Sequence, residues 1–268
     1  MHPLTDLSAQ QAANIRFVLS DIDDTITTEG RLTSRAYAAL EQLTEAGMIV
    51  IPITGRPAGW CDHIARMWPV FAVVGENGAF YMRYDRLAKK MLTHHFAEAA
   101  QRRMNRQKLN ELSTRILSAV PGCGLASDQH YREADLAIDF CEDVPPLNEF
   151  EVQKIVGLFQ EAGAQAKVSS IHVNGWFGNY DKLSMTQTLF TREFGLKLQE
   201  QLGTTLFIGD SPNDEPMFEF FDLSVGVANI QRQLHRLKHP PKFVTPSKAG
   251  DGFVDIAQYI LRAKGFKS

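Results

Sequence analysis

Cysteine is scarce in this chain of 268 residues, which contains only three. Cys61, Cys123 and Cys141 are widely spaced, odd in number and not arranged as a Cys-x-x-Cys pair. This pattern argues against a disulfide-bonded scaffold and a zinc site, and it fits the reducing cytoplasm. Long apolar runs are also missing, because runs such as Met48–Ile51 are far shorter than the about 20 residues of a membrane helix. We therefore expect a cytoplasmic protein that is not held in a membrane.

The chain also lacks a strong net charge. It has 28 Lys and Arg against 31 Asp and Glu, a formal net charge of -3. A nearly balanced charge gives no support for a nucleic acid or an anionic membrane surface as partner. Hydrophobic residues make up 44%, a normal share for a globular protein, which excludes wholesale disorder. At about 150 residues per domain, the length predicts two domains or one domain with a large insertion.

Strand-like and helix-like segments alternate in both end regions of the chain. Apolar runs at Ile15–Leu19, Met48–Ile53 and Leu206–Ile208 are typical of strands buried on both faces. A helical pattern follows the first of them from about Ser34. The alternation predicts an α/β fold whose core is a Rossmann-like, doubly wound parallel sheet.

The pattern changes between the two end regions. A long charged helical pattern covers residues 98–119, and Val168–Val173 reads as a strand of a different sheet. We interpret this stretch as an inserted α+β domain. The predicted division is a core of residues 1–84 and 181–268, interrupted by an inserted cap of residues 85–180.

Acidic residues follow two of the predicted strands. Asp21 and Asp23 come directly after the first strand, two residues apart, so an extended chain points both the same way. Asp210 ends a later strand and is followed by Asn213 and Asp214. If these strands are neighbours, the carboxylates crowd together where α/β sheets bind ligands, and they need a hard cation such as Mg²⁺. Alternatively, each aspartate caps a helix or a turn.

Four segments, taken in order, resemble the motifs of one family. They are DIDDT at Asp21–Thr25, Thr54 in PITGR, Lys182 in YDKLS, and GDSPND at Gly209–Asp214. With them, the whole chain resembles the haloacid dehalogenase-like (HAD) phosphohydrolases. The segment VVGENGAF and the insertion resemble the Cof-type and sugar-phosphatase branch, which carries a large α/β cap.

The resemblance implies the roles of the acidic residues. Asp21 would be the nucleophile that takes up the phosphoryl group, and Asp23 would act as general acid and then as general base. Mg²⁺ would be held by the Asp21 carboxylate, the main-chain carbonyl of Asp23, and Asp210, with Asp214 as a further ligand or as support. Asn213 would support the site by orienting Asp210 or a water molecule.

Phosphate binding is expected from a second group of residues. On the resemblance, Thr54, Gly55 and Lys182 would bind the phosphoryl oxygens. Read alone, Thr54 is equally well a helix cap, and Lys182 is an ordinary surface lysine.

Candidate substrate contacts carry a weaker signal. They are Arg56, Asn77, His172, Asn174 and Trp176. Arg56 either contacts substrate or pairs with an acid. An aromatic beside amides suits sugar recognition, but Trp176 is as well explained by packing.

The sequence thus predicts an Mg²⁺-dependent phosphoric monoester hydrolase. The expected substrate is a small phosphorylated metabolite, above all a sugar phosphate, cleaved through an aspartyl-phosphate. A phosphomutase of the phosphomannomutase type uses the same residues and stays open, as does a non-catalytic phospho-receiver or metabolite-binding protein. We expect a monomer or a small homo-oligomer.

Overall fold

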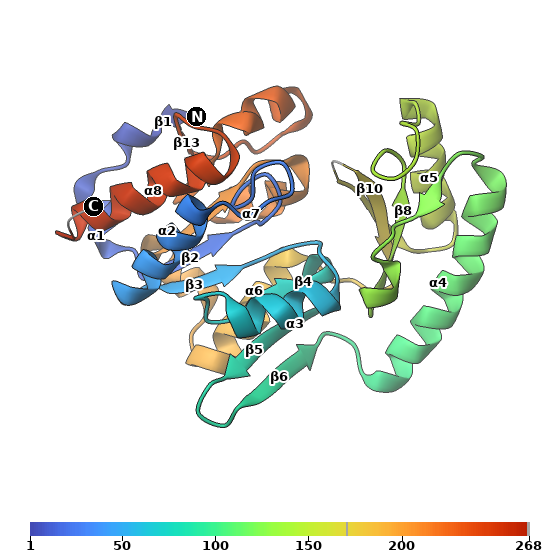
Figure 1. The fold of residues 1–268 in the computed structure, drawn as a ribbon, viewed down its shortest axis with the longest axis horizontal. Coiled ribbons are helices and arrows are strands. Elements are labelled where there is room, and N and C mark those ends of the chain that lie inside the picture. The colour runs from blue at the N-terminus through green and yellow to red at the C-terminus, as the bar shows by residue number, and fades with distance from the viewer. Residues whose placement is uncertain (170, 267–268) are drawn as a thin grey trace.

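The computed structural model describes residues 1–169 and 171–266. Three residues lie outside this part of the chain: 170, 267 and 268. All three fall within the predicted domain ranges, and residue 170 also falls within the predicted strand Val168–Val173. The strands form three sheets, of six, four and three strands. In Figure 1 the four-stranded sheet and its helices stand beside the larger body that holds the other two sheets.

The six-stranded sheet is parallel throughout and forms the centre of the larger body. Its strands, in spatial order, are β1 (His2–Pro3), β13 (Phe243–Val244), β12 (Ser224–Gly226), β11 (Thr205–Gly209), β2 (Phe17–Ser20) and β3 (Ile49–Pro52). Because β2 and β11 pair side by side, with Ser20 opposite Ile208, their carboxyl ends meet at one edge. The predicted Rossmann-like parallel core is confirmed.

Helices cover both faces of this sheet, and alternate residues of β2 show why. Val18 packs with one buried cluster that includes α1, α2 and α8, whereas Phe17 and Leu19 pack with another that includes α6 and α7. Full burial of one such side chain contributes about 1.5–3 kcal/mol. The helices are α1 (Ala9–Asn14), α2 (Ser34–Glu45), α6 (Lys182–Leu189), α7 (Glu215–Phe220) and α8 (Ala249–Ala263).

A three-stranded antiparallel sheet extends the larger body beyond β3. Its strands are β4 (Val73–Gly75), β5 (Phe80–Asp85) and β6 (Lys90–His95), and α3 (Ala58–Met67) packs against β4 and β5. A single bridge from Ile53 to Val74 joins the two sheets. Pairing of β6 with β5 ties the first residues of the predicted insertion to the core, while the division at residues 84/85 and 180/181 stays a prediction.

The second body, here called the four-stranded unit, is antiparallel. It consists of β7 (Gly124–Leu125), β8 (Asp135–Asp139), β10 (His172–Trp176), β9 (Gln165–Val168), α4 (Ala99–Ala119) and α5 (Glu149–Glu161). One sheet face packs on α4 and α5 through residues such as Ile138 and Val173. The register places His172 opposite Asp139, so polar side chains occupy the other face.

The prediction of a single strand over Val168–Val173 is wrong. In the structure β9 ends at Val168 and β10 begins at His172, and the two strands run antiparallel. A short segment with residues typical of strands does not by itself reveal whether it belongs to one strand or to two.

Short segments complete the chain. The 3₁₀ segments span Leu4–Asp6, Glu76–Gly78, Gln129–Tyr131, Leu198–Thr204, Pro212–Asp214 and Ala228–Arg236, and a π-helical turn spans Phe190–Phe194. Within residues 1–169 and 171–266, no helix has the length and apolar character needed to cross a membrane.

Candidate active site

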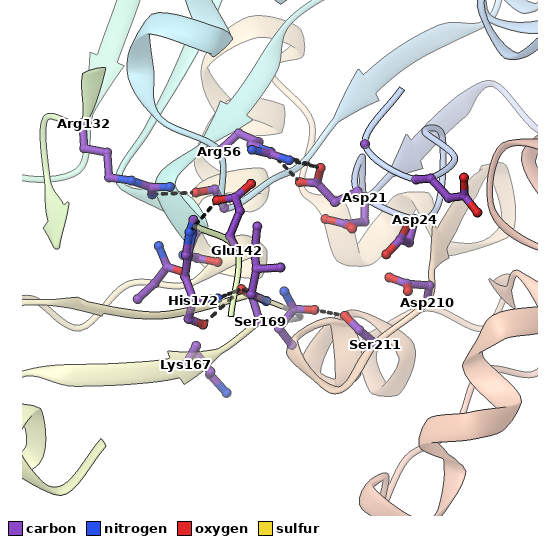
Figure 2. Close-up of a pocket in the computed structure, with 18 residues that line it drawn as sticks. Asp21, Asp24, Arg56, Arg132, Glu142, Lys167, Ser169, His172, Asp210 and Ser211 are labelled. Carbon is purple, nitrogen blue, oxygen red and sulfur yellow. Dashed lines mark hydrogen bonds and ion pairs between the residues drawn. The ribbon is translucent and has the colours of Figure 1, made fainter. Parts of the chain in front are cut away.

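The ends of β2 and β11 bring three carboxylates together, here called the acidic cluster: Asp21, Asp210 and Asp214. One carboxylate oxygen from each lies within 4.8 Å of the others. Asp21 follows β2, Asp210 follows β11, and Asp214 ends the 3₁₀ turn after it. Asp21 and Asp210 lie close together in the cavity of Figure 2. The proximity predicted from the strand ends is therefore present.

Lys182 is the cation that faces the acidic cluster. It is the first residue of α6, only 4% exposed, and its Nζ donates to Asp21 Oδ1 and to Asp214 Oδ1, both at 2.7 Å. Burial raises the pKa of Asp21 to about 7, against the opposing effect of Lys182. Burial, with Asp21 and Asp214 nearby, also raises the pKa of Asp210 well above its usual value. Three carboxylates face one ammonium, so negative charge is in excess.

The free oxygens of this cluster show what it can bind. Asp214 is fully engaged, because its Oδ2 accepts from the Asp210 N–H at 3.2 Å while Oδ1 binds Lys182. No residue among 1–169 and 171–266 donates to Asp21 Oδ2. In the described part of the chain, Asp210 Oδ1 accepts only from the Thr25 hydroxyl, at 3.5 Å. Carboxylate oxygens with few or no protein donors are the ligands that a hard divalent cation takes, so the donor set fits such an ion.

Gly78 allows the start of α6, and with it Lys182, to lie close to the acidic cluster. Gly78 has a φ of 104°, and a Cβ there would lie 2.0 Å from the carbonyl oxygen of Asp181. Asp181 caps α6 by accepting from the Ser184 N–H at 2.8 Å. Only glycine adopts this left-handed backbone and leaves room for the start of α6.

Asp23 is held by Arg56. The guanidinium donates from Nε at 3.0 Å and from Nη2 at 2.8 Å, and the Asp23 side chain remains 36% exposed. Arg56 also stacks on Trp60, with 4.6 Å from its Cζ to the ring centroid, and its Nη1 lies 3.9 Å from Asp128 Oδ2. Of the two interpretations of Arg56, pairing with an acid is present in the structure, and contact with a substrate stays a prediction.

Thr54 and Gly55 form the turn between β3 and α3. Thr54 is fully buried, and its Oγ1 accepts from the Arg56 N–H at 3.0 Å. Thr54 does not itself line the cavity described below, and its binding of phosphate stays a prediction. Gly55 lies against Asn77, because a Cβ at Gly55 would be 3.1 Å from Asn77 Oδ1. Asn77 itself has a φ of 57° and lines the same cavity as Gly55.

A cavity of about 350 Å³ separates the strand ends of the core from the polar face of the four-stranded unit. Figure 2 shows its charged walls. The core contributes Asp21, Asp23, Asp24, Glu29, Gly30, Gly55, Arg56, Asn77, Asp210, Ser211 and Asn213. From residues 132–174 come Arg132, Glu142, Lys167, Ser169, Ile171, His172 and Asn174.

Four of the five predicted substrate residues line this cavity, and Trp176 does not: the four are Arg56, Asn77, His172 and Asn174. His172 is buried with its Nε2 2.8 Å from Glu142 Oε2, and burial lowers its pKa. Asn174 Nδ2 donates to Asp135 Oδ2 at 3.1 Å. Trp176, only 2% exposed, instead stacks on Tyr180 with ring centroids 5.7 Å apart. Its role in binding stays a prediction.

A second buried charged group joins the two bodies, and sequence reasoning missed it. We call it the clasp: Glu76, Arg132 and Asp135. Glu76 Oε1 accepts from the N–H groups of Ala58 and Glu133 at 2.9 and 2.8 Å. Its Oε2 accepts from those of Ala134 and Asp135 at 2.6 and 3.1 Å. Burial raises the pKa of Glu76 to about 7.

Arg132 completes the clasp. It is buried, and its Nη1 donates to Asp135 Oδ1 at 3.1 Å and to the carbonyl oxygen of Gly55 at 3.0 Å. The clasp therefore fixes the start of β8 beside the turn at Thr54 and Gly55. Within VVGENGAF, Glu76 was noted only as part of a family pattern, and no local signal marks Arg132.

Asn229 is another residue that the sequence reasoning passed over. Its side chain donates to Asp210 Oδ2 at 2.9 Å. It follows β12 closely, so the strand-end rule that selected Asp21 could also have selected it.

Comparison with known proteins places the fold in a family. A family model for haloacid dehalogenase-like hydrolases matches residues 18–117 and 148–256. A protein from Thermoplasma acidophilum is similar in structure, with 20% identity, a TM-score of 0.68, and 93% of this chain and 98% of that chain covered. No curated protein matches the chain.

Two solved structures from Bacteroides thetaiotaomicron are also similar. One is a phosphatase of the haloalkanoate (HAD) superfamily, with 18% identity, a TM-score of 0.60, and 94% and 95% of the two chains covered. The other is a haloacid dehalogenase-like hydrolase, with 15% identity, a TM-score of 0.64, and 92% and 99% covered. At such identities these likenesses show the fold, and the family model covers most of the chain. The chain belongs to the haloacid dehalogenase-like hydrolases, in their Cof-type branch.

Proposed function

We propose that the protein is an Mg²⁺-dependent phosphatase that hydrolyses a small phosphate monoester through an aspartyl-phosphate on Asp21. One observation carries this proposal: Asp21 lines the cavity with one oxygen on Lys182 and the other without a donor among residues 1–169 and 171–266. A carboxylate oxygen that is oriented, faces the cavity and has no hydrogen-bond donor is suited to nucleophilic attack.

In the first step, an oxygen of Asp21 attacks phosphorus. A bond forms between this oxygen and phosphorus, the bond from phosphorus to the leaving-group oxygen breaks, and Asp23 gives that oxygen a proton. In the second step, Asp23 takes a proton from water, whose oxygen attacks phosphorus and releases Asp21 and inorganic phosphate. Arg56 donates to both oxygens of Asp23 and so orients this carboxyl group.

Phosphoryl oxygens would be bound by Lys182, Thr54 and the turn at Gly55. Two of the three ammonium hydrogens of Lys182 are used by Asp21 and Asp214, which leaves one for the phosphoryl group. Mg²⁺ would be held by Asp21 and Asp210, with the Asp23 carbonyl and support from Asp214 and Asn213. When bound, it would neutralise charge that develops on the phosphoryl oxygens.

The substrate class proposed is a sugar phosphate. The polar face opposite the acidic cluster offers the His172–Glu142 pair, the Asn174 amide and the Ser169 hydroxyl, groups that bind hydroxyls. We further propose that residues 85–180 act as a cap over the core. A cavity of about 350 Å³ between the acidic cluster and this polar face favours a small metabolite as substrate.

Phosphate release tests the proposal. Wild type, Asp21→Asn and Asp23→Ala are assayed with Mg²⁺ on sugar phosphates, nucleotides, phosphoglycolate and pyridoxal phosphate. We expect one substrate with kcat/KM above about 10⁴ M⁻¹s⁻¹ and a loss of at least about 10³-fold in Asp21→Asn. Circular dichroism checks that both variants fold.

Two outcomes would contradict the proposal. Wild type could release no more phosphate than Asp21→Asn from any compound. Alternatively, Asp23→Ala could turn over as fast as wild type, because a phospho-receiver needs Asp21 alone and has no use for a general acid.

A further inference from the structure

We propose that Asn229 is a positioning residue that holds Asp210 in the orientation required for cation binding. The inference rests on the proposed function, since it deepens the account of the same acidic cluster. Asn229 lies just after β12, in the 3₁₀ segment Ala228–Arg236. Because β12 pairs with β11, the side chain of Asn229 reaches the carboxylate at the end of β11.

The Asn229 amide uses both donors and its acceptor. Nδ2 donates to Asp210 Oδ2 at 2.9 Å and to the main-chain carbonyl of Asp24 at 3.0 Å. Oδ1 accepts from the Ala249 N–H at 2.9 Å. Two oxygens need donors and one N–H needs an acceptor, so only one orientation of the amide satisfies all three partners. The side chain therefore joins three segments that are distant in the sequence.

The anchor of this amide is the strained first turn of α8. Ala249 has a φ of 50°, a left-handed conformation that is uncommon for alanine. The following residue, Gly250, is pressed against the segment after Asp24, because a Cβ there would lie 2.7 Å from the carbonyl oxygen of Ile26. The Gly250 N–H also donates to Thr28 Oγ1 at 3.2 Å. The turn thus holds the Ala249 N–H toward Asn229 while it packs on the loop after β2.

This anchoring decides which oxygen of Asp210 is available. Oδ2 is taken by Asn229, whereas Oδ1 has only the 3.5 Å contact with the Thr25 hydroxyl. Without Asn229, the carboxylate is free to rotate and is repelled by Asp21 and Asp214, which lie within 4.8 Å. Asn229 therefore keeps Asp210 in the acidic cluster against like-charge repulsion, which favours the arrangement that a divalent cation needs.

The test is cation binding in the absence of substrate. Free Mn²⁺ is counted by electron paramagnetic resonance in titrations of wild type and Asn229→Ala, and Mg²⁺ is added as competitor. Loss of a group that orients a metal ligand typically costs 10–100-fold in affinity, so we expect the Mn²⁺ dissociation constant to rise by about tenfold or more. If Asn229→Ala does not fold, Asn229→Leu fills nearly the same volume without a donor and makes the same prediction.

A matched control separates positioning from general stability. Asn105 is a buried asparagine in α4 whose Nδ2 donates to the carbonyl oxygen of Phe177 at 3.0 Å, far from the acidic cluster. Asn105→Ala is expected to unfold at lower urea concentration and to keep the Mn²⁺ affinity of wild type. An equal loss of affinity in Asn105→Ala overturns the inference, as does an unchanged dissociation constant in a folded Asn229 variant.

Activity provides the second readout. In Asn229→Ala, the Mg²⁺ concentration for half-maximal rate should rise in parallel with the dissociation constant, while kcat at saturating Mg²⁺ returns to near the wild-type value. If no substrate is turned over but Mn²⁺ binding still depends on Asn229, the proposed function fails and the inference on Asn229 stands. If wild type binds no Mn²⁺, the inference is overturned.

Discussion

The acidic cluster and the clasp are both groups of buried carboxylates with one buried cation. Lys182 serves the acidic cluster and Arg132 serves the clasp. Burial is also the largest cause of the raised pKa of Asp21 and of Glu76, each to about 7. Neither burial, nor charge pairing, nor a shifted pKa therefore separates a reactive group of this protein from a structural one.

The acidic cluster and the clasp differ in how many of their carboxylate oxygens accept hydrogen bonds. Glu76 accepts four main-chain N–H bonds, and Asp135 accepts from Arg132 and Asn174. In the acidic cluster, by contrast, Asp21 Oδ2 has no donor among residues 1–169 and 171–266. A perturbed pKa marks a candidate site, and the unfilled oxygens identify which candidate can bind or attack.

The largest effect is expected for Asp210→Asn, which removes one charge from the unfilled group. Turnover should fall by about 10³-fold or more, since a cation ligand is lost. The metal-free protein should unfold at higher urea concentration than wild type, because like-charge repulsion with Asp21 and Asp214 is relieved. Phosphate release and urea unfolding in EDTA measure the two effects. If Asp210→Asn lowered the stability and kept the turnover of wild type, Asp210 would be a structural residue, which contradicts the comparison of the acidic cluster with the clasp.

In the clasp, where the carboxylates have hydrogen-bond donors, Arg132→Met should lower the stability of the fold, whereas Asp210→Asn should raise it. Removing the cation leaves the buried carboxylate of Asp135 without its ion pair, which costs about 3–5 kcal/mol of unfolding free energy. The control is Arg115→Met, because Arg115 and its partner Glu161 are exposed on the same unit and their pair is worth about 1 kcal/mol or less. Urea unfolding compares the variants. Equal losses would mean that the clasp carries no more stability than a surface ion pair.

Mg²⁺ should stabilise the fold through the acidic cluster alone. At a concentration of about 100 times its dissociation constant, a cation that binds only the folded state adds about 2.7 kcal/mol. We expect this gain in wild type and in folded Arg132→Met, and its absence in Asp210→Asn. Urea unfolding with Mg²⁺ or with EDTA gives the difference. A gain that survives in Asp210→Asn places the cation elsewhere.

The smallest effect concerns the pH dependence of stability. The pKa of Glu76 is raised from 4.5 to about 7 in the folded protein, so its contribution is fully present below pH 4.5 and is lost as the pH rises through about 7. Between these values the unfolding free energy of Glu76→Gln should therefore fall less steeply than that of wild type. Urea unfolding in EDTA at a series of pH values tests this, and parallel curves would contradict it.

The sequence predicted the groups that lie next to an apolar strand. Asp21 and Asp210 were found because a strand points to its own carboxyl end, and the structure does bring them together. Lys182 was found through the order of the motifs. The single strand Val168–Val173 was predicted wrongly, because residues from the end of one strand and the start of the next were assigned to one element.

What the sequence could not reveal is long-range contact with the main chain. Glu76 binds N–H groups 57 to 59 residues further along, and any sequence can supply such groups. Asn229 likewise binds the main chain at Asp24 and Ala249. Partners of this kind depend on how the two bodies meet, and no residue pattern encodes that arrangement.

Gly78 has a consequence for efforts to redesign this enzyme. Because Gly78 has no side chain, the start of α6 packs directly against it. This close packing places the ammonium group of Lys182 within hydrogen-bond distance of Asp21. A mutant library aimed at new substrates can vary the cavity wall, for example at His172 or Lys167. Position 78 tolerates no such variation: an alanine there would push back the first turn of α6 and withdraw the lysine, although the two residues are 104 positions apart in the chain.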